Sequence, residues 1–127
     1  MKNFSGLHLQ PTTLAWIKAI GFKTPTPIQE AVIAEILQGN DVVGISRTGS
    51  GKTHAYLIPV MDKVDPADDH IQAVITAATR ELAMQIYEQA KSMLQFKKNL
   101  RIGLYAGGTD RNKEIRRLQR IQPHIVI

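Results

Sequence analysis

A glycine-rich stretch carries the residues of this chain best suited to chemistry. It reads Ser46-Arg47-Thr48-Gly49-Ser50-Gly51-Lys52-Thr53. Glycines allow a tight turn in which backbone N–H groups approach phosphate oxygens. A lysine then reaches the β- and γ-phosphates, and the next hydroxyl ligates Mg²⁺. The stretch therefore predicts a nucleoside triphosphate site with Lys52 and Thr53 as catalytic residues and Thr53 as the metal ligand.

This stretch departs from the strict phosphate-loop pattern at one position. The pattern G-x-x-x-x-G-K-[ST] requires glycine where the chain has Ser46. The context still fits, because an apolar run at residues 42–45 precedes the loop and a helical pattern follows it. The loop alone leaves helicases, nucleotide kinases and GTPases open. A GTPase would need N-K-x-D to read guanine, and the only candidate, Asn112-Lys113-Glu114, is followed by Ile115.

Periodicity on both sides of the loop indicates alternating helices and strands. Apolar residues at helical spacing predict helices, and Pro11, Gly21 and Gly39 mark their starts and ends. The expected helices cover residues 14–20, 27–38, the loop to residue 61 (with Pro59 kinking or ending it), 80–96 and 110–122. The expected strands cover residues 42–45, 71–77, 101–105 and 125–127. This alternation indicates right-handed βαβ units and an α/β fold with a parallel sheet.

Composition excludes several classes of protein. The chain has 127 residues, a length typical of one domain at most. It has no cysteine, which excludes disulfides, thiolate metal sites and a cysteine nucleophile, and fits a reducing compartment. No apolar run approaches a membrane span, and the first ten residues lack the basic and apolar regions of a signal peptide. We therefore expect a soluble, cytoplasmic protein with no membrane partner.

Positive charge is concentrated in the last third of the chain. The formal net charge is +5, from 16 basic and 11 acidic residues. Residues 91–120 contain nine Lys or Arg and two Asp or Glu, a local excess of seven. Such an excess is typical of a surface that binds a polyanion, although a solvated helix face gives the same pattern.

The segment upstream of the loop has a local explanation and a functional one. It reads Gly21-Phe22-Lys23-Thr24-Pro25-Thr26-Pro27-Ile28-Gln29. Thr26 as N-cap, Pro27 at the first helical position and Gln29 two residues later would form a capping box. The same nine residues resemble the Q motif of DEAD-box ATP-dependent RNA helicases, G-F-x-x-P-T-P-I-Q, throughout. Phe4 lies 17 residues before Gly21, like the isolated upstream aromatic of that family.

Three further motifs of that family follow in order. Residues 46–53 resemble motif I, A-x-T-G-x-G-K-T, which usually has alanine where this chain has Ser46. Residues 78–83 resemble motif Ia, P-T-R-E-L-A, with Ala78 in place of proline, and residues 105–108 resemble the GG motif. The resemblance implies a P-loop, RecA-like parallel sheet with flanking helices. Residues 1–127 would be part of the N-terminal ATP-binding domain, with the Q motif at 4–29, the phosphate loop at 46–53, motif Ia at 78–83 and the GG motif at 107–108.

The resemblance also implies roles for individual residues. Phe22 would stack on adenine, buttressed by Phe4, and the Gln29 carboxamide would pair with the N6 and N7 edge of adenine. The ATP and Mg²⁺ cofactors would be held by Phe22, Gln29, Ser46, Arg47, Thr48, Gly49, Ser50, Gly51, Lys52 and Thr53. RNA phosphates would be bound by Thr79, Arg80, Gly107 and Gly108. Contacts to the RNA backbone alone imply weak sequence preference and a steep salt dependence. The helix at 110–122 would either extend this surface or be a solvated outer face.

Several family elements are missing from these 127 residues. They contain no D-E-A-D run, whose carboxylates hold Mg²⁺ and position water, and no T-P-G-R or S-A-T motif or second domain with its arginine finger. We therefore expect the N-terminal portion of a helicase that couples ATP hydrolysis to RNA unwinding, ending before these motifs. Alone it is expected to bind ATP and RNA without turnover. An unpaired sheet edge, such as the strand at 42–45, is expected to make it marginally stable or self-associating.

Overall fold

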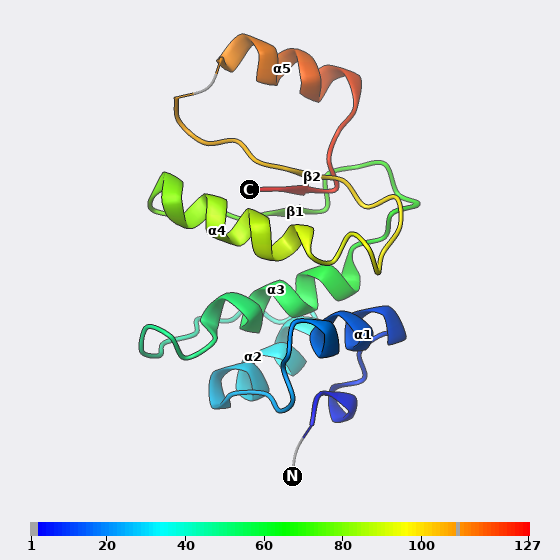
Figure 1. Ribbon diagram of the computed structural model, residues 1–127, viewed down its shortest axis with the longest axis vertical. Coiled ribbons are helices and arrows are strands. Elements are labelled where there is room, and N and C mark those ends of the chain that lie inside the picture. Colours follow the sequence, from blue (N-terminus) through cyan, green and yellow to red (C-terminus); the bar gives the residue numbers. More distant parts are fainter. Residues whose placement is uncertain (1–2, 109) are drawn as a thin grey trace. The chain divides into compact units, whose positions relative to one another are not determined.

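The computed structural model describes residues 3–108 and 110–127, and the chain divides into two compact units. Unit 1, Met1–Lys63, is helical, and unit 2, Val64–Ile127, holds a small sheet and two helices (Figure 1). Among the described residues, no helix combines the length and the apolar character needed to cross a membrane.

Unit 1 consists of a 3-10 helix and three α-helices: η1 (Phe4–Leu7), α1 (Pro11–Ala19), α2 (Pro27–Leu37) and α3 (Lys52–Lys63). Pro11 occupies the first turn of α1, and Gly21 follows its end with a φ of 87°. The predicted capping box begins α2. The Thr26 N–H donates to Gln29 Oε1 at 3.0 Å, and the Gln29 N–H donates to Thr26 Oγ1 at 3.4 Å. These boundaries agree with the sequence because they depend on neighbours in the chain.

The apolar core of unit 1 lies where α1 and α2 pack against α3. Its fully buried large side chains are Trp16, Ile33, Leu57, Ile58 and Met61. Burial of each such apolar side chain contributes about 1.5–3 kcal/mol. This packing holds α3, which begins at Lys52, against the two N-terminal helices.

Asp62 joins α3 to the start of α1. Its Oδ1 accepts hydrogen bonds from the Gln10 N–H at 2.8 Å and from the Thr13 hydroxyl at 2.7 Å, and Thr13 is fully buried. We expect Asp62→Ala to lower the free energy of unfolding by about 2–3 kcal/mol, because the buried Thr13 hydroxyl loses this acceptor. Urea unfolding compares it with Asp41→Ala, which removes an exposed carboxylate. Equal midpoints for the two variants would contradict this role.

Residues 42–45 form no strand, so the sequence prediction is wrong at this segment. Successive residues of the segment face alternately toward α2 and toward solvent, as in an extended chain. Val43 and Ile45 are each 88% exposed, whereas a Cβ on Gly44 would lie 3.5 Å from Ile28 Cδ1 of α2. Among the described residues of unit 1, no strand lies beside it. A strand needs a neighbour for its N–H and C=O groups, and an apolar run without one stays irregular.

Helix α3 continues through Pro59 to Lys63, although the sequence predicted a kink or an end near this proline. Proline in a helix interior removes one hydrogen bond and crowds the preceding turn, at a cost of about 3 kcal/mol. Leu57, Ile58 and Met61 are fully buried around it. Burial of three such side chains outweighs that cost, so the packed helix persists.

Unit 2 contains β1 (Ala73–Val74), α4 (Arg80–Lys91), β2 (Ile102–Gly103), α5 (Arg111–Arg120) and β3 (Ile125–Val126). The sheet order is β1-β3-β2, and both pairs are parallel, with Ile125 opposite Ala73 and Ile102. Figure 1 shows α4 and α5 on opposite sides of this sheet. The predicted α/β arrangement with a parallel sheet is therefore present here, and β1 and β2 form the sheet edges.

Several elements of unit 2 are shorter than their sequence patterns. Each strand has two residues, although single hydrogen bonds continue beyond them, as from the Ile75 N–H to the Val126 carbonyl. Helix α4 ends at Lys91 rather than at residue 96. The N–H groups of Met93, Leu94 and Phe96 instead bond three residues back, which tightens the chain into turns. Met93 is fully buried, so the buried apolar positions continue beyond the end of α4.

Candidate functional site

The glycine-rich loop leads directly into α3. Gly49 and Gly51 have φ values of 80° and 94°, a region that side chains with a Cβ rarely adopt. The Ser50 N–H donates to the Arg47 carbonyl at 3.2 Å, and the Ser50 hydroxyl donates to that carbonyl and contacts the Ser46 hydroxyl. The loop is therefore a tight turn that ends at the free N–H groups of the first turn of α3, the arrangement that binds anions.

Lys52 spans the loop from the first residue of α3. Its Nζ donates to the Ser46 carbonyl at 2.6 Å, so the ammonium group lies at the mouth of the turn. The Thr53 side chain is hydrogen-bonded within the same turn of helix. Burial raises the pKa of Tyr56, and a hydrogen bond with the Thr53 side chain opposes this rise. The structure thus gathers the predicted cation and the predicted metal-binding hydroxyl on one helical turn.

Gln29 links α2 to the loop. Its Oε1 accepts from the Thr26 N–H, and its Nε2 donates to the Gly51 carbonyl at 3.2 Å. The side chain is only 2% exposed. A carboxamide has two N–H donors and two acceptor lone pairs, so one donor and one lone pair are left for a ligand. The pairing with adenine stays a prediction, and in the structure Gln29 tethers the loop to α2.

Gly51 is the point where the loop meets this tether. A Cβ at this position would lie 2.6 Å from Gln29 Nε2 and 3.0 Å from Thr26 Oγ1. Real Cβ atoms do not approach heavy atoms that closely, and the capping box leaves the Gln29 carboxamide little room to move. The close approach therefore requires glycine for reasons of packing as well as of backbone conformation.

Phe22 contacts His54, a residue near the start of α3 that the sequence analysis did not predict. Its ring lies edge-on to the His54 imidazole, with 4.7 Å between the ring centroids, and Trp16 lies 6.0 Å from the same imidazole. Burial lowers the pKa of His54, which favours the neutral ring. The sequence offered one indication of a role for His54, because this residue directly follows Thr53, the last residue of the loop motif. Phe22 is half-buried, and its stacking on adenine stays a prediction.

The predicted RNA-contacting residues gather in unit 2 at the carboxyl ends of the strands. A cavity of about 330 Å³ is lined there by residues that follow β1 and β2 and by the start of α4, among them Thr79, Arg80 and Gly107. Ligands of open parallel sheets bind in the crevice outside this edge. The structure therefore brings together Arg80 and Gly107, which are 27 residues apart in the sequence.

Arg80 and Gly108 are in contact at this edge. Gly108 has a φ of 90°, and a Cβ on it would lie 2.8 Å from Arg80 Nη1. The Thr79 hydroxyl accepts from the Leu82 N–H at 3.1 Å, so it caps α4. Tyr105, which also lines the cavity, was not among the predicted site residues, although it is the first residue of the segment 105–108 that resembles the GG motif. Its ring packs on Gly103, where a Cβ would lie 2.6 Å from Tyr105 Cε2.

Comparison with known proteins identifies relatives of the whole chain. The family model for the DEAD/DEAH box helicase matches residues 26–127. The chain is 45% identical over 126 residues to the DEAD-box ATP-dependent RNA helicase CshB of Bacillus subtilis, which covers 98% of this chain and 28% of that protein. It is 39% identical over 127 residues to CshA of Bacillus cereus, covering 100% and 24%. The chain thus spans about a quarter of the length of these relatives.

Solved structures have the same fold. A DEAD box protein from the hyperthermophile Methanococcus jannaschii superposes with a TM-score of 0.90 at 36% identity, covering 100% of this chain and 34% of that one. A variant of S. cerevisiae Dbp5 bound to RNA and ADP BeF3 gives a TM-score of 0.82 at 29% identity, covering 100% and 32%. These matches confirm the resemblance and the fold class inferred from the motifs. The chain belongs to the DEAD/DEAH box helicase family.

Proposed function

We propose that this chain provides the ATP-binding surface and part of the RNA-binding surface of a cytoplasmic ATP-dependent RNA helicase. The observation that carries the proposal is the loop at the start of α3. There Lys52 Nζ bonds to the Ser46 carbonyl and Gln29 bonds to Gly51. The similarity to CshB and CshA, both DEAD-box ATP-dependent RNA helicases, supports it.

The residues of the loop fit a triphosphate with Mg²⁺. A Cβ on Gly49 would meet nothing within 4 Å, so the glycine leaves the loop backbone open to the close approach of a phosphate. Lys52 would exchange the Ser46 carbonyl for β- and γ-phosphate oxygens, and the Thr53 hydroxyl would supply one metal ligand. Mg²⁺ would neutralise charge on the phosphates during their cleavage. Within the described residues no cluster of three His, Cys, Asp or Glu could hold a metal.

RNA would lie at the carboxyl edge of the sheet in unit 2. Arg80 offers a planar fork of N–H donors for a phosphate, and Gly107 and Gly108 leave their backbone N–H groups accessible. The Thr79 hydroxyl caps α4 through its lone pair, so its O–H remains available as a donor. Contacts of this kind recognise the backbone and leave the bases unread.

The direct test is ATP hydrolysis by the complete gene product, with and without single-stranded RNA. We expect RNA to stimulate hydrolysis of ATP, and the enzyme to separate short RNA duplexes only when ATP is present. A rate of ATP hydrolysis that is the same with and without RNA would indicate another P-loop NTPase, such as a nucleotide kinase or a GTPase. The 127 residues alone, which contain no D-E-A-D run, are proposed to bind without turnover. Hydrolysis that follows their peak on a sizing column would refute that part.

Gln29→Ala separates adenine recognition from loop support. We expect ATP affinity to fall about 10- to 100-fold, since hydrogen bonds worth about 1–3 kcal/mol are lost, and GTP affinity to fall less. Titration of both nucleotides into the wild type, Gln29→Ala and the exposed control Gln38→Ala measures this selectivity. Equal losses of affinity for ATP and GTP would mean that Gln29 only tethers the loop at Gly51 and does not recognise adenine. Unchanged ATP affinity would refute the assignment of this residue altogether.

A further inference from the structure

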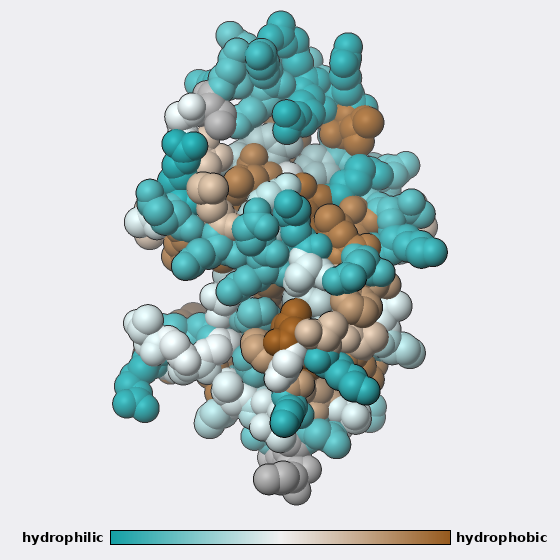
Figure 2. Space-filling model, in the orientation of Figure 1, coloured by the Kyte–Doolittle hydropathy of each residue, from teal (hydrophilic) through white to brown (hydrophobic). Residues whose placement is uncertain are grey.

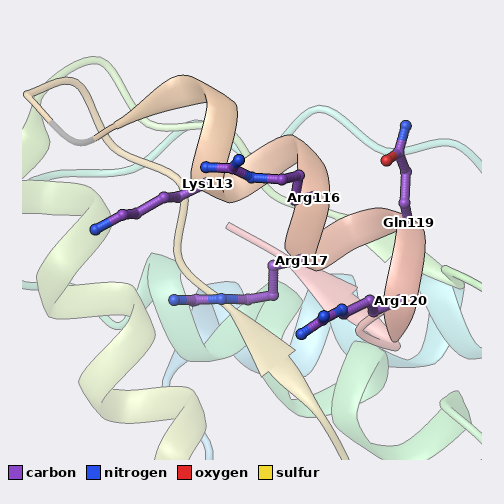
Figure 3. Close-up of a pocket in the computed structure, with 5 residues that line it drawn as sticks. All are labelled: Lys113, Arg116, Arg117, Gln119 and Arg120. Carbon is purple, nitrogen blue, oxygen red and sulfur yellow. The ribbon is translucent and has the colours of Figure 1, made fainter.

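Helix α5 presents one strongly basic face. Lys113, Arg116, Arg117 and Arg120 recur at helical spacing i, i+3, i+4 and i+7, which confines them to about 100° of the helix circumference. Figure 3 shows these four side chains extended to the same side of α5, whereas Gln119 points away from them. Together with Gln119 they line a cavity of about 570 Å³. We call the four cationic residues the basic face.

The basic face is exposed and carries an excess of positive charge. No residue of α5 is buried, and Figure 2 shows hydrophilic side chains covering this helix. Glu114, three residues before Arg117, is the single acidic residue of α5, so the four cations outnumber the carboxylates of this helix by three. Four cations held about 10 Å apart or less on one helix repel one another, and a bound polyanion would relieve this repulsion.

The basic face adjoins the cavity at the carboxyl edge of the sheet. Burial raises the pKa of Tyr105, the charge of Arg117 partly opposes this rise, and the charge of Glu114 adds to it, so both charged residues lie near a residue that lines that cavity. Gly107 and Gly108, which lie at the same edge against Arg80, are joined to α5 by a short connection. The basic face thus continues the surface of unit 2 that the proposed function assigns to RNA phosphates.

The chemistry of this face favours a nucleic-acid backbone over a protein partner. Three of its four cations are arginines, whose forked donors bind phosphate in a bidentate manner. It has no aromatic or aliphatic side chain of the kind that anchors protein–protein interfaces.

We propose that the basic face of α5 is a second RNA-backbone site, which extends the contact surface of Arg80, Gly107 and Gly108 along the same strand. The inference rests on the proposed RNA-binding function and adds the residues that lengthen its footprint. Each arginine on this face neutralises one phosphate and displaces its condensed counterions.

The test is a double substitution on this face in the complete gene product, Arg116→Gln with Arg117→Gln. Affinity for a short labelled single-stranded polyuridine RNA is measured between about 50 and 200 mM salt. Each phosphate contact to single-stranded nucleic acid contributes about 0.7 to the slope of log K against log salt, or about fivefold in affinity near 0.1 M salt. We therefore expect about 25-fold weaker binding, and a slope shallower by about 1.4.

A matched control removes the same charge elsewhere in unit 2. Lys98→Gln with Arg111→Gln takes away two exposed cations, and Arg111 lies on the other side of α5. Only a general effect of net charge, less than about threefold, is expected for it. Because α5 buries no residue, both variants are expected to match the wild type in circular dichroism and thermal unfolding. Equal losses of RNA affinity in both variants would overturn the proposal.

Other results separate this inference from the proposed function. If the wild type hydrolyses ATP on addition of RNA, and the basic-face variant keeps its RNA affinity and salt slope, the inference fails and the proposed function stands. If RNA binding depends on the basic face but ATP hydrolysis never responds to RNA, the proposed function fails instead. A basic-face variant with unchanged RNA affinity but altered self-association in light scattering would identify a second copy as the occupant and overturn the RNA assignment.

Discussion

Lys52→Ala is expected to reduce RNA-stimulated ATP hydrolysis by about 10²- to 10³-fold, the loss typical when a charge-stabilising donor is removed from a reacting centre. Lys52 Nζ lies at the mouth of the loop, bonded to the Ser46 carbonyl, so it needs no rearrangement of the chain to reach a phosphate. Its side chain is exposed, and alanine leaves only that carbonyl open to water. Stability is therefore expected to change little while turnover is lost.

Phosphate release by the complete gene product, with RNA present, measures this loss. The matched control is Lys63→Ala, because Lys63 is an exposed lysine at the other end of α3. It is expected to retain wild-type turnover. RNA-stimulated hydrolysis that persists in Lys52→Ala would show that Lys52 has no part in the reaction.

Gly51→Ala is expected to damage both the fold and the nucleotide site. Alanine at a φ of 94° is strained, and its Cβ would meet Gln29 Nε2 at 2.6 Å. Gln29 cannot retreat without giving up its bonds to the Thr26 N–H and the Gly51 carbonyl. We expect the free energy of unfolding to fall by about 2–3 kcal/mol and ATP affinity to fall at least about tenfold.

Gly49→Ala provides the comparison for this variant. Gly49 has a similar φ of 80°, but a Cβ on it would meet nothing within 4 Å. It should therefore show backbone strain alone, about 1 kcal/mol. Urea unfolding and ATP titration of both variants separate strain from the contact with Gln29. Equal effects in the two variants would mean that the contact has no energetic role.

The sequence predicted most helix boundaries of the fold but not the extent of its strands. Helix α2 begins at Pro27 as expected, because its capping box lies within four adjacent residues. Residues 42–45 have the composition of a buried strand and yet form none, since a strand depends on a partner that composition does not reveal. Pro59 is the converse case, where burial of neighbouring side chains overrides a local signal to end the helix.

The candidate site was predicted unevenly for a similar reason. Lys52, Thr53 and the glycines were found from their spacing, because a phosphate loop is continuous in sequence. His54 and Tyr105 were missed, although each lies in or beside a recognised motif, because their contacts with Phe22 and Gly103 arise from segments that pack together. The roles of Phe22 and Thr79 in binding remain predictions, and in the structure Thr79 caps α4.

The sequence by itself determined the family, the glycine turn, the caps of the helices and the excess of positive charge, because each of these depends on residue types at short spacing. Only the tertiary structure decided which distant residues meet. Gln29 reaches Gly51 across 22 residues, Asp62 reaches Thr13 across 49, and the Arg80 guanidinium lies against Gly108. Such contacts form when apolar faces pack and bring segments together, and no local pattern records that packing.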